Sequence, residues 1–200
     1  MSGVPLSYEY ERDDFYCYPK SSVLKNKLNI KDWETLDKAE REITGLKAVQ
    51  FSDSPFPEDL DFNYIKKLHK FLFQDIYEWA GETRRVDISK GNIFCQHELI
   101  EINTEALMNE LKSEKYLIET DNMARRLAYY LGDLNNIHPF REGNGRVQRL
   151  FIAELARRAG RDLDFNGITP KEMVIASDKA FRHDYEPLEQ IIRRSLSKTS

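Results

Sequence analysis

The chain has 200 residues and a formal net charge of −4, with 40% hydrophobic, 32% charged and 12% aromatic residues. These values are typical of one globular domain with a sizeable core, and the negative charge argues against an extended nucleic-acid-binding surface. Cys17 and Cys95 form neither a disulfide framework nor a zinc pattern, and no apolar run approaches the roughly 20 residues of a membrane helix. Because the sequence also shows no secretory leader, we expect a cytoplasmic protein without a membrane contact.

The first third of the chain predicts a surface segment and two helices. The first twenty residues are polar and rich in tyrosine, without a helical period, and are expected to lie on the surface. Asp32 is a suitable cap for a first helix. Helical spacing predicts its buried face as Leu36, Ala39, Ile43, Leu46 and Val49. A second helix is predicted from about Asp61 to Gly81, and its inward residues are Ile65, Leu68, Leu72 and Ile76.

The sequence period changes after Gly81 and predicts one β-hairpin. Val86 and Ile88 alternate with polar residues, residues 89–92 (Ser-Lys-Gly-Asn) are typical of a turn, and an extended stretch resumes over 93–95. An isolated two-stranded hairpin is only marginally stable in water. We therefore expect it to lie against the helical body or to pair with a further strand.

Helical periodicity fills the rest of the chain. One helix is predicted with Leu99, Ile102, Ala106 and Leu111 on one side, and the strongest amphipathic pattern follows at Met123, Leu127, Tyr130, Leu131 and Leu134. That helix must end before His138-Pro139, because a residue preceding proline is pushed out of the α region. The next begins near Asn144, buries Val147, Leu150, Phe151 and Leu155, and ends at Gly160. Two further helices are predicted from the capping box over 169–172 and from a cap at Asp184, the last with Leu188, Ile191 and Ile192 inward.

The segment from His138 to Arg149 concentrates the chemistry of the sequence. His138 has the side chain whose ordinary pKa lies nearest neutrality, so it is a candidate general base. Glu142 is a suitable oxygen ligand for Mg²⁺, which prefers one or two carboxylates together with phosphate oxygens and water. Gly143 and Gly145 allow the backbone N–H groups to approach phosphate oxygens.

The start of the helix after this loop adds positive charge. Its N-terminus favours anions, and Arg146 and Arg149 lie three residues apart on one face, where both guanidinium groups can grip phosphates. Phe140 is expected to anchor the loop in the core. A solvated helix start is the ordinary alternative, and His69, His97 and His183 are expected to be structural. The combination still favours phosphate binding, and the lack of a His-Glu-x-x-His pattern argues against a zinc hydrolase.

At these residues the sequence resembles the Fic family (filamentation induced by cAMP). The family signature H-x-F-x-[D/E]-G-N-G-R-x-x-R is matched at every defined position from His138 to Arg149. The preceding helix, the hairpin near residues 90–92 and the segment Asp184-Tyr185-x-Pro187-Leu188 also resemble Fic proteins. The resemblance implies an all-α fold with one β-hairpin, an N-terminal extension over 1–22, a Fic domain over 23–194 and a tail over 195–200.

The resemblance implies a role for each loop residue. His138 would deprotonate a Ser, Thr or Tyr hydroxyl of a target protein, which attacks the α-phosphate of ATP. Glu142 would hold Mg²⁺. The nucleotide phosphates would be held by Gly143, Asn144, Gly145, Arg146 and Arg149. Lys90 and Gly91 would belong to the nucleotide-binding residues and to the family's flap, which pairs with an extended target segment by strand addition. A hairpin that merely covers the core is the alternative.

Two features of the family distinguish its subtypes. Doc kinases carry lysine at the second loop glycine, whereas this chain has Gly145, which favours AMP transfer over phosphate transfer. Many Fic proteins carry an inhibitory motif [S/T]-x-x-x-E-[G/N], whose glutamate pairs with the outer loop arginine. Only near matches are present, at Ser7–Glu11 and at Ser54–Glu58.

The sequence therefore predicts a protein adenylyltransferase that uses ATP and Mg²⁺. The missing motif suggests a bacterial toxin that is restrained by a small separate antitoxin, and the resemblance implies the ATPase subunit of a type II DNA topoisomerase as one target. A Doc-like kinase, another nucleotidyl transferase and a non-catalytic nucleotide-binding module remain alternatives. A helical antitoxin-like or DNA-associated protein is disfavoured by the negative charge and the lack of a helix-turn-helix pattern.

Overall fold

A computed structural model describes residues 13–51 and 59–198. Within them lie seven α-helices: α1 (Trp33–Phe51), α2 (Phe62–Phe73), α3 (Ile100–Ser113), α4 (Met123–Ile137), α5 (Asn144–Arg158), α6 (Pro170–Ala180) and α7 (Glu186–Ser195). Short 3₁₀ turns precede and follow α3, at His97–Leu99 and Lys115–Leu117. The predicted mainly helical fold is confirmed. The two near matches to the inhibitory motif, Ser7–Glu11 and Ser54–Glu58, lie outside the described residues.

Two small antiparallel sheets accompany the helices. The predicted hairpin is formed by β1 (Ser89–Lys90) and β2 (Asn92–Ile93), so three of its four strand residues, all but Ile93, were predicted as the turn. Gly91 makes the turn with φ +76°, a left-handed conformation that glycine adopts without strain. A second pair joins β3 (Arg161–Leu163) to β4 (Leu196–Lys198). The sequence analysis missed this pair, because three-residue strands carry too short a pattern to be recognised.

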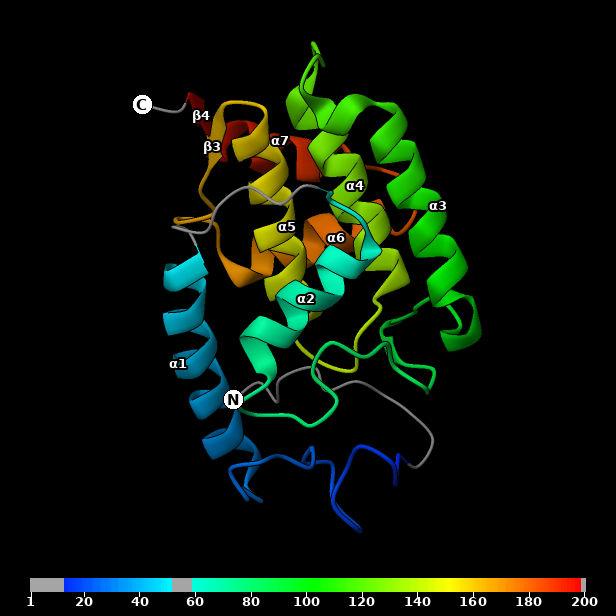
Figure 1. Cartoon of the computed structure of the whole chain (residues 1–200), viewed down its shortest axis with the longest axis vertical. Helices are drawn as coiled ribbons and strands as arrows, with labels where there is room; N and C mark the ends of the chain where they lie inside the picture. The colour runs from blue at the N-terminus through cyan, green and yellow to red at the C-terminus, as the bar shows by residue number, and fades with distance from the viewer. Residues whose placement is uncertain (1–12, 52–58, 199–200) are drawn as a thin grey trace.

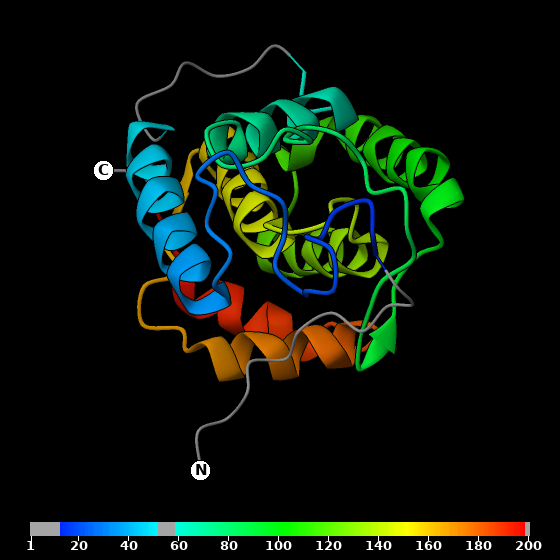
Figure 2. The same ribbon diagram turned by 90° about the horizontal axis from the view of Figure 1, so that it is seen from below.

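Helix α4 lies at the centre of the molecule, where α3, α5, α6 and α7 pack around it (Figure 1). Its apolar face is fully buried at Leu127, Ala128, Tyr130 and Leu134. The view from below shows α6 crossing one side of the α4–α5 pair, with α1 and α2 on other sides (Figure 2). No helix within the described residues is long and apolar enough to span a membrane.

The beginning of the described chain is more deeply buried than predicted. Tyr16 and Cys17 belong to the core, and the buried carboxylate of Asp13 pairs with Arg141 at 2.7 Å. In Figure 2 this segment crosses the end of the molecule at which α5 begins. Residues before the predicted boundary at 23 therefore contribute to the packing under the loop.

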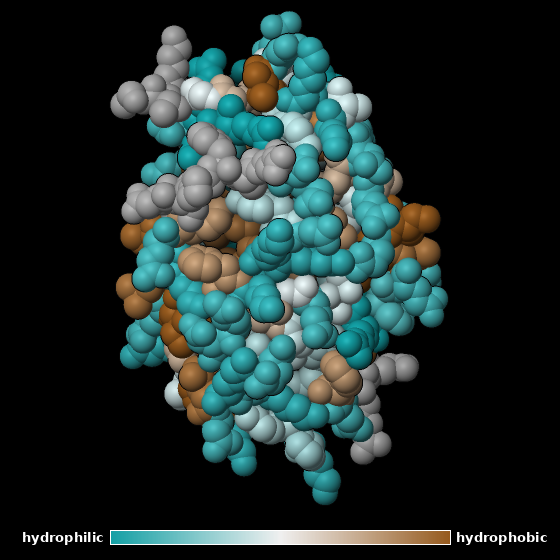
Figure 3. All heavy atoms as spheres, viewed as in Figure 1, coloured by the Kyte–Doolittle hydropathy of each residue, from teal (hydrophilic) through white to brown (hydrophobic). Residues whose placement is uncertain are grey.

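The predicted buried face is partly wrong on α1 and largely wrong on α3. On α1, Leu36 is buried with Glu40 and Thr44, and the predicted Ala39 and Ile43 are half-buried, whereas Leu46 and Val49 are 70% and 72% exposed. Apolar side chains accordingly show along the α1 edge of the surface (Figure 3). On α3 the buried residues are Ile100, Thr104, Leu107, Met108 and Leu111, whereas Leu99, Ile102 and Ala106 are exposed. Both helices bury polar residues, which a count of apolar positions assigns to the solvent.

Helix boundaries were predicted correctly where a capping residue or a proline next to the boundary determines them. Asp61 caps α2 through Tyr64, and Thr169 and Glu172 form the predicted capping box of α6. Helix α4 ends before His138 as the following proline requires. The end of α2 was placed too late, because the chain turns at Phe73, whose carbonyl accepts from the N–H groups of residues 76 and 77.

The buried face of α1 leads to a stability prediction. Leu36→Ala should lower the free energy of unfolding by about 2–5 kcal/mol, because it leaves a cavity under α1. Leu46→Ala, the matched exposed leucine of the same helix, should change it by less than about 0.5 kcal/mol. Urea unfolding followed by circular dichroism measures both. Equal losses would contradict this orientation of α1.

Candidate active site

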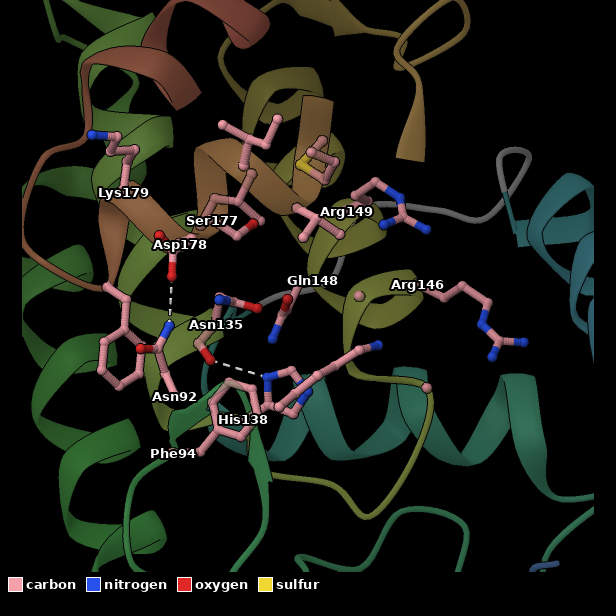
Figure 4. A pocket seen from close by; sticks show the side chains of 18 of the residues that line it. Asn92, Phe94, Asn135, His138, Arg146, Gln148, Arg149, Ser177, Asp178 and Lys179 are labelled. Atoms are coloured by element: carbon pink, nitrogen blue, oxygen red, sulfur yellow. Dashed lines mark hydrogen bonds between the residues drawn. The ribbon is translucent and has the colours of Figure 1, made fainter. Parts of the chain in front are cut away.

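His138 lies immediately after α4, at a sharp reversal of the chain. Its backbone is left-handed, with φ 51° and ψ 62°, and its N–H still bonds to the Leu134 carbonyl at 3.0 Å. The imidazole stacks on the ring of Phe94, with centroids 3.9 Å apart. Its Nδ1 lies 3.0 Å from the Asn135 carbonyl (Figure 4).

These contacts determine which nitrogen of His138 is basic. The Asn135 carbonyl only accepts, so Nδ1 must carry the hydrogen of the neutral ring, and Nε2 keeps the lone pair. Burial lowers the pKa of His138 to about 3, and the charges of Arg84 and Lys90 act in the same direction. At neutral pH the imidazole is therefore unprotonated and available as a base.

The loop after His138 is held from below by aromatic packing. Phe140 is buried, as predicted, and stacks on His69 with centroids 3.9 Å apart. His69 accepts from the Gly81 N–H at Nδ1, so its Nε2 donates to the Glu142 carbonyl at 3.1 Å. Burial lowers the pKa of His69 to about 3. This histidine is thus structural, as predicted, and supports the loop through its backbone.

The start of α5 combines a fixed backbone with unbonded N–H groups. The Asn144 side chain accepts from the Phe140 N–H at 2.8 Å and donates to the Phe140 carbonyl at 2.7 Å. Its amide is therefore occupied in shaping the loop, and a contact with an anion would have to come from its backbone. Within the described residues, the N–H groups of Asn144 and Gly145 have no backbone acceptor. Such unbonded N–H groups at a helix start are suited to an anion.

Arg146 and Arg149 have different surroundings. Arg146 donates to the Glu40 carboxylate and to the Thr44 hydroxyl at 3.0 Å, and it extends away from His138 (Figure 4). Arg149 has no carboxylate partner among the residues the structure describes. Burial, helped by the charge of Arg146, lowers the pKa of Arg149. Arg149 is therefore a poorly compensated positive charge, as expected of an anion site.

Glu142 and Lys90 line the same cavity. One Glu142 oxygen accepts from the Gly143 N–H at 2.9 Å and lies 3.9 Å from Arg146. Glu142 remains partly exposed to the cavity, so it is suited to share a Mg²⁺ ion with phosphate oxygens and water. The described residues contain no group of three potential metal-ligating side chains, so a metal here would depend on the nucleotide.

A cavity of about 560 Å³ connects these groups. Its lining residues come from the hairpin, the end of α4, the start of α5 and one face of α6. Asn92 of β2 donates to Asp178 of α6 at 2.8 Å and so joins the hairpin to α6 beside the cavity (Figure 4). This volume is in the range of small-molecule sites.

Most of the predicted site residues line one cavity: Lys90, His138, Glu142, Gly143, Gly145, Arg146 and Arg149. Two do not, because Gly91 forms the exposed hairpin turn and Asn144 is buried beneath the loop.

Sequence reasoning missed several residues of the site. Glu40 and Thr44 hold Arg146, and Arg84 contacts the carbonyl of His138. No local pattern could have found them, because these contacts span 106, 102 and 54 residues of sequence.

Comparison with known proteins settles the family. Residues 59–156 match the model of the Fic/DOC family. A relative from Sinorhizobium fredii, named "Probable protein adenylyltransferase", is 40% identical over 189 residues, which are 92% of this chain and 96% of the relative. The chain belongs to the Fic/DOC family.

Further Fic proteins share the whole described fold. The protein adenylyltransferase VbhT of Bartonella schoenbuchensis is 36% identical over 93% of this chain, which spans 40% of that longer relative. The N-terminal Fic domain of a Bartonella quintana effector, solved with ADP, has a TM-score of 0.89 at 30% identity and covers 94% of this chain and 97% of its own. BepC of Bartonella tribocorum, solved with AMPPNP, has a TM-score of 0.90 at 26% identity, with coverages of 96% and 100%.

The two loop glycines should differ sharply in their tolerance of a side chain. Gly143 has φ +79°, and a Cβ there would lie 2.2 Å from the Phe73 ring. Gly143→Ala should therefore destabilise the fold by about 1–3 kcal/mol from overpacking alone and displace the start of α5. Gly145→Ala is the matched control, since its Cβ would meet only the Arg149 guanidinium, at 3.2 Å. Thermal unfolding compares the two, and equal melting temperatures would contradict the packing described.

The surroundings of His138 predict its titration. The imidazole should stay neutral from pH 8 down to pH 5, because its pKa is lowered to about 3 and it gains a proton only near that value. Nitrogen-15 chemical shifts of the ring over this range measure it. In urea the same ring should titrate near its ordinary pKa of about 6.5. A folded-state pKa between 6 and 7 would contradict the prediction.

Proposed function

We propose that this Fic protein transfers AMP from ATP to a hydroxyl group of a target protein. The observation that carries the proposal is the presence, in one cavity, of a neutral His138 and of the poorly compensated Arg149 at a helix start. A neutral imidazole whose lone pair is on Nε2 suits the removal of a hydroxyl proton, and the positive helix start suits a polyphosphate. The relatives named as protein adenylyltransferases support the same activity.

The reaction is a displacement at the α-phosphorus. The target oxygen bonds to phosphorus as its proton passes to Nε2 of His138, and the bond to the bridging oxygen of the β-phosphate breaks, so that pyrophosphate leaves. The backbone N–H groups of Asn144 and Gly145 and the guanidinium of Arg149 would stabilise the phosphate charge. Glu142 would hold Mg²⁺ against the phosphates, where the ion adds charge stabilisation.

The α6 side of the cavity would receive the base of the nucleotide. If the phosphates bind at the start of α5, the base faces the α6 side of the cavity, where Met173, Val174 and Ile175 form an apolar surface. Val174 and Ile175 are half exposed. An aromatic base would cover this apolar surface. The AMPPNP-bound and ADP-bound Fic structures support a nucleotide in this cavity.

The β1–β2 hairpin would present the target. It has only two residues in each strand and pairs with no further strand in the described chain, so its outer edge is open to an added strand. Ile93 at this hairpin is 74% exposed, although it is apolar. Lys90 and Gly91 would lie between the added segment and the nucleotide.

Phosphate transfer is the alternative reaction. Gly145 favours AMP transfer, because a long side chain at this position would press on Arg149, whose Nη1 lies 3.2 Å from the place of a Cβ. A non-catalytic nucleotide-binding module would not need a base with an oriented, unprotonated Nε2. The geometry of His138 therefore favours an enzyme.

The biological setting we propose is that of a toxin restrained by a separate small antitoxin. Arg149 has no carboxylate partner in the described residues, so a glutamate from another chain would find it unpaired. The relation to VbhT supports a target protein and such a partner in general. The ATPase subunit of a type II DNA topoisomerase is the target that we would test first, in the cytoplasm, where ATP and this enzyme would meet.

Labelling with radioactive ATP tests the proposed reaction. With Mg²⁺ and a bacterial lysate, label from α-labelled ATP should appear on a protein, whereas γ-labelled ATP should leave none. His138→Ala should lower transfer by about 10²–10⁴-fold, the usual contribution of a general base. Mass spectrometry of the labelled band identifies the target. Label from the γ-phosphate would instead support a kinase, and no label from either would overturn transfer.

A further inference from the structure

Arg84 is a buried cation bonded mainly to backbone oxygen atoms. It is 2% exposed, and burying a guanidinium group is costly unless its N–H groups are bonded. Its Nε donates to the His138 carbonyl at 2.9 Å, and its Nη1 donates to the Val86 carbonyl at 2.7 Å. Its Nη2 donates to the carbonyls of Cys95 and, at 3.3 Å, of Ile137.

These four carbonyls belong to two segments, the hairpin and the end of α4, whose relative position matters for the proposed AMP transfer. Val86 and Cys95 lie on either side of the β1–β2 hairpin, at its two feet. Ile137 and His138 are the last residue of α4 and the proposed base. One guanidinium group therefore ties both feet of the hairpin to the end of α4.

Two backbone hydrogen bonds join the same two segments. The N–H of Arg84 donates to the Pro139 carbonyl at 2.9 Å, and the N–H of Cys95 donates to the Asn136 carbonyl at 3.1 Å. The neighbouring carboxylate of Asp87 lies 3.6 Å from Arg84, but it is half exposed and also bonds to His97. An exposed ion pair contributes little, so the carbonyl contacts explain the position of Arg84.

The orientation of the imidazole depends on both of the linked segments. His138 adopts a left-handed backbone, which is unfavourable for a residue with a Cβ and persists only where its surroundings hold it. Arg84 satisfies the carbonyl that this conformation turns away from the helix. The imidazole also stacks on the ring of Phe94 in the hairpin segment. Phe94 directly precedes Cys95, whose carbonyl is bound by Arg84.

We propose that Arg84 is a positioning residue for AMP transfer. It fixes the distance between Nε2 of His138 and a hydroxyl presented by the hairpin, without touching either substrate, since it does not line the cavity. The inference rests on the proposed AMP transfer and on target presentation by the hairpin. Lysine cannot replace Arg84, because a single ammonium lacks the planar fork that reaches carbonyls on both sides.

Arg84→Lys tests the proposal by separating positioning from nucleotide binding. The turnover number for AMP transfer should fall about 100-fold, as expected for a misplacement of about 1 Å at the reacting atoms. The Kd for AMPPNP should stay within about twofold. In hydrogen exchange, the Cys95 amide should exchange faster than in the wild type.

The matched control is Arg126→Lys. Arg126 lies near the start of α4, bonds to the carboxylates of Glu110 and Glu114 and does not line the cavity, so this variant also replaces a hydrogen-bonded guanidinium by an ammonium but leaves the loop untouched. It should retain transfer within about threefold, a small change beside the 100-fold loss expected of a misplaced base. An equal loss in both variants would overturn the proposal in favour of a general effect of replacing an arginine. A full turnover number in Arg84→Lys, or a loss of AMPPNP affinity equal to the loss of turnover, would also overturn it.

Two outcomes concern folding and the reaction itself. If Arg84→Lys does not fold, Arg84→Gln is measured in the same way. If neither variant folds, the proposal is overturned, because Arg84 is then required for folding rather than for positioning. If the wild type transfers no AMP, the proposed function fails. Hydrogen exchange at Cys95 and the ring shifts of His138 then still decide whether Arg84 couples the hairpin to the imidazole, and unchanged values would overturn that coupling.

Discussion

The steric conflict between Pro139 and the residue before it is the constraint on which the site depends. Proline excludes the helical conformation at His138, so α4 ends there and the chain reverses through a left-handed residue. The reversal turns the imidazole back toward the last turn of α4, where the Asn135 carbonyl sets its tautomer. It also sends the loop over His69 and Phe140 and starts α5 at Asn144. A base and a helix N-terminus thereby face one cavity.

The positive charge of the site serves two chemical needs at once. Arg149 and the start of α5 favour phosphate oxygens, whereas Arg84 and Lys90 disfavour a proton on His138. Positive charge around the proposed anion site thus favours the neutral form of the proposed base. Burial is the larger influence on His138 and acts in the same direction. Among the described residues Glu142 is the carboxylate that lines the loop side of the cavity, and it is the one that would serve a metal ion in the proposed reaction.

The sequence predicted the parts of the fold that neighbouring residues determine. The proline after His138, the cap at Asp61 and the capping box at Thr169 each act within four residues, and each was confirmed. The buried face of α1 could not be predicted in this way. Glu40 is buried because Arg146, 106 residues later, needs a partner, and a count of apolar positions selects Leu46 instead. Arg84 is hidden from sequence patterns for a similar reason, since its acceptors are backbone atoms and two of them, at Ile137 and His138, are 53 and 54 residues away.

The two signature arginines, equivalent in sequence, are unequal in the folded chain. Glu40 neutralises Arg146 from α1, a helix outside the segment that matches the family model. Burial and Arg146 both raise the free energy of the charged Arg149, which has no carboxylate to offset that cost among the described residues. An anion therefore gains more by approaching Arg149 than Arg146. This asymmetry supports the proposal that the phosphate of a nucleotide and the carboxylate of an inhibitory partner would both approach Arg149, where the two would compete.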